Sequence, residues 1–130
     1  MRLLLDTHTF LWWIDDAPRV SQRVRTVIAD DSNTLYVSAV TGWEIAIKVA
    51  VGRLTLQSHS DPSAAVLKHM DVNAIRELPV RMEHALRVAT LPPLHGDPFD
   101  RLLVAQAMVD GLTIVTSDHL VAAYDVETIW

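Results

Sequence analysis

Short apolar runs alternate with segments of helical periodicity along the whole chain. The apolar runs predict buried strands at residues 2–5, 35–37, 74–78, 112–115 and 126–130. Helices, the first of them short enough to be a turn, are predicted at residues 7–14, 22–29, 39–51, 63–70, 82–89 and 98–110. Because nearly apolar strands that alternate with helices are typical of a parallel sheet covered on both faces, we expect an α/β fold. No repeat, linker or low-complexity tract interrupts the pattern, which predicts a single domain over residues 1–130.

Residues of capping type stand at the ends of several predicted helices. Ser21, Ser38 and Asp97 suit N-caps, and Gly52 and Gly111 follow the last turns of two helices. A polar loop is expected over residues 58–62.

Two aspartates lie three positions apart in the segment HGDPFDRLLVAQA, which covers residues 95–107. Asp97 suits the N-cap and Pro98 the first helical position, and a carboxylate in the first turn, such as Asp100, meets the positive end of the helix dipole. Both acids could therefore serve only to start the helix.

A helical projection distinguishes the second aspartate from a simple cap. Asp100 shares a face with Val104 and Ala107, whereas the polar strip of the helix is predicted to run through Gln106 and Asp110. A lone carboxylate on a packing face normally protonates, pairs with a cation or binds a metal, because its desolvation is costly.

Four acids are expected at one edge of the predicted sheet. Asp6 ends the first strand, Glu44 lies in the helix after the second, Asp100 starts the helix before the fourth, and Asp118 follows the fourth strand. In open parallel sheets, chemistry collects beyond the carboxyl ends of the strands. If these strands are neighbours, the converging negative charges need a cation or raised pKa values.

Each acid also has an ordinary structural interpretation. Asp6 could hydrogen-bond the turn that follows its strand, and Asp118 could be a turn residue. Glu44 precedes Lys48 by four positions, which favours an ion pair on the surface of a helix. It is their joint position at one sheet edge that favours a site.

Residue types restrict the chemistry of such a site. The chain has no cysteine, which excludes disulfides, thiolate zinc sites and a cysteine nucleophile. Its six histidines show no paired zinc-binding spacing, and His95 and His119 could contact substrate or form local hydrogen bonds. Carboxylate oxygens suit Mg²⁺ or Mn²⁺, which favours hydrolysis of a phosphodiester by a metal-activated water.

Charge and hydropathy bear on partners and location. The net charge of −5 argues against a protein that coats itself in nucleic acid, although Arg19, Arg23 and Arg25 could contact phosphate or form a solvated helix face. No apolar stretch is long enough to span a membrane, and the start MRLLLDTH is too short in apolar residues for a signal peptide. We expect a cytoplasmic protein without a membrane partner.

Four segments together resemble the PIN-domain ribonucleases of the VapC toxin kind. They are LLLDTHTFLWW, SAVTGWEIAIKVAVGRL, HGDPFDRLLVAQA and LTIVTSD, followed by YDVETIW. The resemblance implies a PIN-like three-layer fold, with a central parallel sheet of about five strands flanked by helices. It also implies Mg²⁺- or Mn²⁺-dependent cleavage of RNA by the toxin of a toxin–antitoxin pair, a homodimer, and inhibition by a small cognate antitoxin.

The family's acidic site falls on Asp6, Glu44, Asp100 and Asp118, which the resemblance makes both the metal ligands and the catalytic residues. Asp97 remains the helix cap. Gly96 replaces a larger or basic residue that relatives often have, which puts an arginine contact to RNA in doubt. Gly42 stands inside a helix, where glycine costs about 1 kcal/mol relative to alanine, and could let another backbone approach closely.

An apolar patch is predicted from the aromatic residues near the amino terminus. Trp12, Trp13 and Trp43, with Phe10 and Leu11, are more aromatic surface than a small core readily hides. A contiguous patch of this kind would suit a segment of the antitoxin.

Two other kinds of protein also place acids at the ends of strands. One is a signalling module that binds Mg²⁺ without hydrolysing a phosphodiester, and the other is a nuclease that cleaves DNA instead of RNA. A receiver-like Mg²⁺-binding signalling module needs a lysine after a late strand, but the two lysines are Lys48 and Lys68. A flap-type DNA nuclease usually carries more acids and extra elements that grip DNA. A module that binds RNA or antitoxin without catalysis is a third alternative, against which the presence of all four acids argues.

Overall fold

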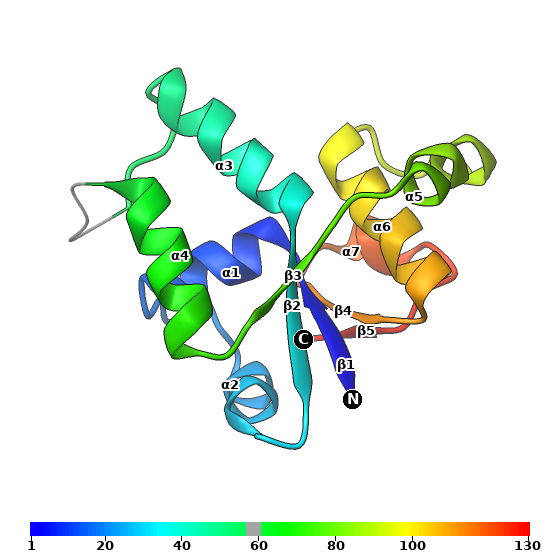
Figure 1. The fold of residues 1–130 in the computed structure, drawn as a ribbon. Helices are drawn as coiled ribbons and strands as arrows, with labels where there is room; N and C mark the ends of the chain where they lie inside the picture. Colours follow the sequence, from blue (N-terminus) through cyan, green and yellow to red (C-terminus); the bar gives the residue numbers. More distant parts are fainter. Residues whose placement is uncertain (57–60) are drawn as a thin grey trace.

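The computed structural model describes residues 1–56 and 61–130, so that His59 and most of the predicted loop at 58–62 lie outside the described residues. Five strands form one parallel sheet, with helices between them (Figure 1). The strands are β1 (Arg2–Leu5), β2 (Thr34–Ser38), β3 (Arg76–Leu78), β4 (Thr113–Val115) and β5 (Thr128–Ile129). The helices are α1 (Thr7–Ile14), α2 (Gln22–Ala29), α3 (Ala39–Ala50), α4 (Pro62–Val72), α5 (Met82–Arg87), the 3₁₀ helix η1 (Val88–Thr90), α6 (Pro98–Asp110) and α7 (His119–Ala122).

The strand order is β3-β2-β1-β4-β5, which confirms the expected α/β fold with a parallel sheet. From β1 the chain adds β2 and β3 on one side, and later β4 and β5 on the other. The order therefore reverses between β1 and β4, and such a switch point leaves a crevice at the carboxyl ends of the strands. Asp6 and Asp118 follow these two central strands.

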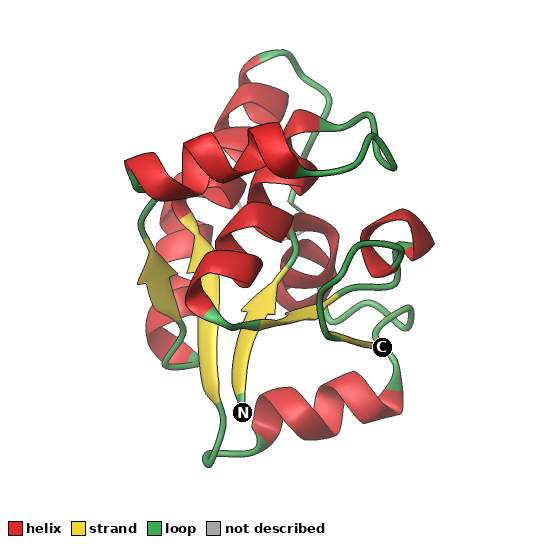
Figure 2. Cartoon of the chain, turned by 90° about the vertical axis from the view of Figure 1, so that its right-hand side faces the viewer, coloured by secondary structure: helices red, strands yellow, loops and turns green. Residues whose placement is uncertain are grey.

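Alternate residues of β1 pack into two separate cores, one on each face of the sheet. Leu3 and Leu5 contact α1 to α4, whereas Leu4 points to the opposite face and packs with α6 and α7. All three leucines are fully buried, as expected for a central strand of a parallel sheet. Figure 2 shows the strands side by side and α2 beside the N-terminus, at the lower end of the sheet.

Local capping chemistry sets most of the boundaries. Ser21 and Ser38 accept hydrogen bonds from Val24 N and Val40 N, which confirms both as N-caps. Gly111 closes α6 in the left-handed conformation, with φ of 65°. Pro62 is the first residue of α4, where a missing N–H costs nothing, and not part of the preceding loop.

Several other boundaries also differ from the prediction. The third strand begins at Arg76 and not at Ala74, because Ala74 leaves α4 in the left-handed region with φ of 52°. The helix expected over 82–89 is α-helical only to Arg87 and continues as η1. The fifth strand is confined to Thr128–Ile129.

Gln106 lies in the interior, so the predicted polar strip on α6 is wrong at this position. Its side chain is fully buried, where its Oε1 accepts a hydrogen bond from Ser38 Oγ at 2.6 Å and its Nε2 donates to Pro79 O at 3.2 Å. A buried amide is tolerated when it is hydrogen-bonded. Gln106 therefore ties α6 to the ends of β2 and β3, close to the carboxyl edge of the sheet.

The contiguous apolar patch predicted from the aromatic residues is also wrong. Phe10 and Leu11 are core residues, and Trp12 and Trp13 are partly buried against the same core. Trp43 is 60% exposed, but it packs edge-on against Phe99 of α6. In the part of the chain that the structure describes, no helix has the length and apolar character to cross a bilayer.

The arginines near α2 favour the structural interpretation. Arg25 donates to Asp16 Oδ1 and to Ala17 O, both at 2.7 Å, and the guanidinium of Arg19 lies over the ring of Trp12. Asn33, just after α2, accepts a hydrogen bond from the N-terminal amine, which places this segment at the amino ends of the strands. It is therefore at the opposite edge of the sheet from the four acids.

Candidate metal centre

Two of the four predicted acids are fixed by the helices that they cap. Asp6 is the N-cap of α1, and its Oδ1 accepts a hydrogen bond from Thr9 N at 2.8 Å. Asp118 caps the short helix α7, which was not predicted, and its Oδ1 accepts from Leu120 N at 2.8 Å. In each carboxylate one oxygen accepts the capping hydrogen bond, and the other oxygen can bind a further partner.

The structure confirms Asp97 of the HGDPFD segment as the helix cap and gives Asp100 no capping role. Asp97 is the N-cap of α6, where its Oδ1 accepts from Phe99 N at 2.8 Å, and Pro98 is the first helical residue. Asp100 lies in the first turn without a capping hydrogen bond and is only 9% exposed. The helix start thus sets the position of Asp100, as the projection suggested.

Glu44 is only 2% exposed, so the ion pair does not lie on the surface of the helix, as the structural interpretation had it. The pairing itself is present, because Lys48 Nζ lies 2.5 Å from Glu44 Oε2. The other oxygen, Oε1, is the one buried side-chain polar atom among the described residues that has no hydrogen-bond partner. A buried carboxylate oxygen without a partner is costly unless a cation or donor reaches it.

His95 joins two acids that come from different segments. Its Nε2 lies 2.8 Å from Asp118 Oδ2 and 3.2 Å from Asp100 Oδ2. One atom of each of these three residues falls within 4.8 Å of the others, which is the spacing of a group that could hold a metal ion. The structure therefore brings Asp100 and Asp118 together directly.

The charges of Asp6 and Glu44 also act on this group. Burial, followed by the charges of Asp97, Asp6 and Glu44, raises the pKa of Asp100 to about 7. Burial likewise raises the pKa of Asp6. All four predicted acids thus lie close enough to form one negative cluster.

Asp118 behaves differently because it is nearer to solvent. Its partial burial acts to raise the pKa, but the hydrogen bonds from His95 and from the backbone N–H of Leu120 outweigh this and lower it. Asp118 therefore ionises more readily than Asp6 and Asp100, whose pKa values are raised.

The residue set fits a divalent cation of the Mg²⁺ or Mn²⁺ type. The donors are carboxylate oxygens, one of them buried and without a partner, and their mutual repulsion already disfavours ionisation of Asp100. A cation would satisfy the orphaned oxygen and reverse this effect. Asp6, Glu44, Asp100 and Asp118 are the residues that would hold it.

Sequence reasoning missed the role of Thr116, which links two of the acids. This buried threonine hydrogen-bonds Asp6 through its side chain, and its Oγ1 accepts from Asp118 N at 3.0 Å. The signal is present in the segment VTSD, because a threonine two residues before an aspartate commonly forms such a local turn.

A second group with metal-ligand spacing, formed by Glu83, His84 and Asp110, already has a cation. The guanidinium of Arg81 pairs with Glu83 and, at 2.8 Å, with Asp110 Oδ1. His84 Nε2 completes the network at 2.9 Å from Asp110 Oδ2. This group holds α5 against the end of α6 and requires no metal.

Comparison with known proteins identifies a family whose model matches most of the chain. The family model described as the PIN domain matches residues 3–127. The chain is 29% identical over 118 residues to Ribonuclease VapC22 of Mycobacterium tuberculosis (strain ATCC 25618 / H37Rv), a match that covers 90% of this chain and 87% of that protein.

Solved structures share the fold over nearly the whole chain. The crystal structure of VapBC2 from Rickettsia felis, bound to a DNA fragment from its promoter, matches with a TM-score of 0.70 and 14% identity, covering 99% of this chain and 98% of the other. FitAcB from Neisseria gonorrhoeae matches with a TM-score of 0.59 and 21% identity, covering 98% and 96%.

The crowding of negative charge predicts that Asp100→Asn stabilises the metal-free protein. The pKa of Asp100 is about 7 in the fold and near 3.8 when unfolded, so stability falls as pH rises from about 4 to 7 and stays reduced above 7. Asparagine avoids this loss. In EDTA at pH 8 the variant should melt roughly 5 °C above wild type, which a gain of about 1 kcal/mol gives in a domain of this size.

The gain should shrink as the pH falls toward 4 and vanish below it, because Asp100 is protonated in the fold and becomes protonated in the unfolded state as well. The exposed turn residue Asp31 supplies the control, and Asp31→Asn should leave the melting temperature unchanged. An Asp100→Asn protein that melts no higher than wild type at pH 8 would contradict the charge crowding.

Proposed function

The chain belongs to the PIN domain family, and from this premise we propose that it is a metal-dependent endoribonuclease, the toxin of a toxin–antitoxin pair. The observation that carries the proposal is the acidic cluster of Asp6, Glu44, Asp100 and Asp118 at the switch point of the sheet, with a buried oxygen that has no partner. The relative VapC22 is a ribonuclease, which supports RNA as the substrate.

Mg²⁺ or Mn²⁺ would supply Lewis-acid chemistry, lowering the pKa of water and offsetting charge that builds on the scissile phosphate. The protein's own residues hold the acids in place. Asp6 and Asp118 are fixed by their caps, Glu44 by Lys48, and Asp100 by the start of α6. Lys48 also brings a positive charge to the rim of an acidic site, where a phosphate must approach.

Different observations argue against the two alternatives that are not nucleases, the receiver-like module and the module that only binds RNA or antitoxin. Membership of the PIN domain family removes the receiver-like module. A module that only binds RNA or antitoxin would have no need of buried carboxylates that repel one another, because such an arrangement costs stability. We therefore assign the cluster to catalysis.

RNA cleavage by the purified protein tests the proposal. In Mg²⁺ or Mn²⁺ wild type should cleave RNA and EDTA should stop it. Asp100→Asn should lower the rate by about 100-fold or more, since the loss of even an outer partner at a metal site costs about 10–100-fold. Asp97→Asn is the matched control, because it removes the same charge from the same helix start while asparagine remains a good N-cap.

Asp97→Asn should therefore retain cleavage within a few-fold of wild type. Metal-dependent cleavage that survives Asp100→Asn would refute the site assignment. Equal loss in both variants, with both folded, would show that the two aspartates do not divide their roles as described.

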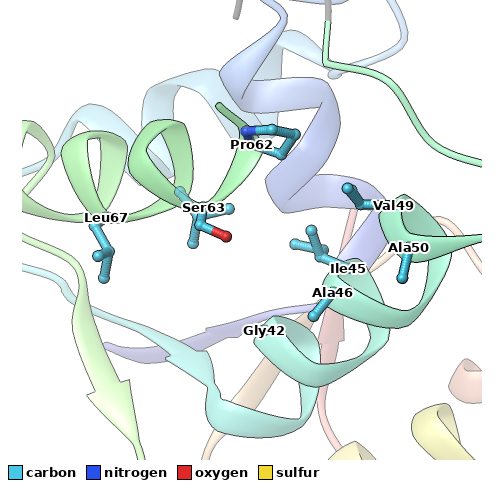
Figure 3. A pocket seen from close by; sticks show the side chains of 9 residues that line it. Gly42, Ile45, Ala46, Val49, Ala50, Pro62, Ser63 and Leu67 are labelled. Atoms are coloured by element: carbon cyan, nitrogen blue, oxygen red, sulfur yellow. The ribbon is translucent and has the colours of Figure 1, made fainter. Parts of the chain in front are cut away.

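We propose that the antitoxin binds to an apolar groove between α3 and α4. It has a volume of about 370 Å³ and contains none of the four acids. It is lined by Gly42, Ile45, Ala46, Val49 and Ala50 of α3 and by Pro62, Ser63, Val66 and Leu67 of α4. Figure 3 shows the labelled residues of the two helices around the groove. Amphipathic segments commonly bind to grooves of this kind.

Gly42 is one of the residues that line this groove. A Cβ at this position would meet no atom within 4 Å, so the close approach of another backbone, expected as one use of this glycine, does not occur within the described chain. Glycine at this position lowers the stability of the helix by about 1 kcal/mol, and a close backbone contact that would explain it is not found within the described chain. We propose that an apolar segment of the antitoxin packs over Gly42 and that this contact compensates for the loss.

A charge placed in the groove should weaken the antitoxin complex. Ala46 is exposed on α3 in the groove lining, so Ala46→Asp can be accommodated without burying the charge in the free protein. Affinity for the cognate antitoxin should fall by about 10-fold or more, since a buried unpaired charge costs several kcal/mol. Ala85→Asp on the exposed face of α5 is the matched control and should bind normally.

Cleavage of RNA by the free Ala46→Asp protein should persist, which separates the groove from the acidic site. Affinity unchanged from wild type would place the antitoxin elsewhere. The homodimer implied by the family resemblance stays a prediction.

A further inference from the structure

His95 is held on several sides in the loop before α6. Its backbone N–H donates to Tyr124 Oη at 2.9 Å, and its ring Nδ1 accepts a hydrogen bond from Asp97 N at 3.0 Å. On the opposite side of the ring, Nε2 faces Asp118 Oδ2 and Asp100 Oδ2. The side chain is 12% exposed, so the ring has little freedom to take another position.

These contacts determine which ring nitrogen carries the proton. Because Nδ1 accepts a backbone N–H, it has no hydrogen of its own, and in the neutral ring the proton is therefore on Nε2. Nε2–H then donates to Asp118 Oδ2 at 2.8 Å, and the same nitrogen lies 3.2 Å from Asp100 Oδ2 without a hydrogen bond to it. The positive end of this N–H therefore lies against both carboxylates.

The same assignment excludes two other roles. Neither ring nitrogen has a lone pair free for a cation, because Nδ1 accepts from Asp97 N and Nε2 is protonated. His95 is therefore not a metal ligand in this arrangement, although its distance from the two acids would allow it. The neutral ring cannot accept a proton at Nε2, and releasing one would leave an imidazolate. A proton-transfer role would require the bond to Asp97 to break.

We propose that His95 is a positioning residue that holds Asp100 and Asp118 side by side for the metal ion. This inference rests on the proposed metal-dependent function. The two carboxylates come from the start of α6 and the cap of α7, and like charges on separate segments would otherwise move apart. The N–H of His95, which is hydrogen-bonded to Asp118 and in contact with Asp100, offsets part of their repulsion, and each oxygen still has a lone pair for the ion.

The contact matters most for Asp118, whose side chain is 33% exposed. Its Oδ1 is bound by Leu120 N and its Oδ2 by His95, so the second bond is what keeps the carboxylate turned toward Asp100 instead of toward solvent. His95 thus acts through Asp118 and Asp100, and it is not itself a catalytic residue.

Two substitutions separate this role from a purely structural one. His95→Asn places a carbonyl oxygen where Nδ1 was, which preserves the bond to Asp97 N but is too short to reach the acids. His95→Gln reaches the acids with an amide N–H but has no acceptor at the Nδ1 position. Asparagine therefore retains the helix start, and glutamine retains the donor.

Calorimetric titration of Mn²⁺ into each protein is the test, with melting temperatures in EDTA as a check on folding. We expect His95→Asn to lose about 10–100-fold in Mn²⁺ affinity and His95→Gln to stay within a few-fold of wild type. The opposite order, with asparagine like wild type and glutamine impaired, would show that His95 only starts the helix and would overturn the proposal.

Two further readouts complete the test. Nitrogen NMR of the wild-type ring in EDTA at pH 8 should show the proton on Nε2; a proton on Nδ1 would overturn the proposal without reference to any metal. Wild type that binds Mn²⁺ but cleaves no RNA would refute the proposed function and leave the positioning role measurable. Wild type that binds no Mn²⁺ would overturn both.

Discussion

Repulsion between carboxylates at one edge of a parallel sheet is the constraint on which this structure depends. Asp6, Glu44, Asp100 and Asp118 come from four segments, and burial together with neighbouring charge raises the pKa of Asp100 to about 7. The fold offsets part of this repulsion, since backbone N–H groups bind Asp6 and Asp118, Lys48 binds Glu44, and His95 bridges two of the acids. Among the described residues, one buried oxygen of Glu44 remains without a partner, and this is the oxygen that the proposed divalent cation would satisfy.

Local chemistry made much of the fold predictable from the sequence. Caps such as Ser21, Ser38 and Asp97 act within three residues of themselves, so their side chains identify the helix starts without knowledge of the rest of the chain. The apolar strands and their alternation with helices were sufficient to predict the parallel sheet. The four acids were placed at its carboxyl edge for the same reason, because strand ends fix the edge on which they lie.

The failures concern polar residues whose environment depends on distant segments. Gln106 is polar by type but buried, because Ser38, 68 positions away, supplies its partner. Glu44 and Lys48 have the spacing of a surface pair, but packing of α3 near Asp100 buries the glutamate. Periodicity within one helix cannot reveal such partners, and it also could not show that Phe10 and Leu11 would be covered by other elements.

The most direct measurement of the central claim is the location of a bound Mn²⁺ ion by paramagnetic broadening of backbone amide signals. Substoichiometric Mn²⁺ should first broaden the amides of Thr7, Arg101 and His119, which follow Asp6, Asp100 and Asp118 in the sequence. The amides around Glu83 and Asp110, where Arg81 already neutralises the second acidic group, should remain sharp. Broadening centred on that second group, or spread evenly over the protein, would contradict the account.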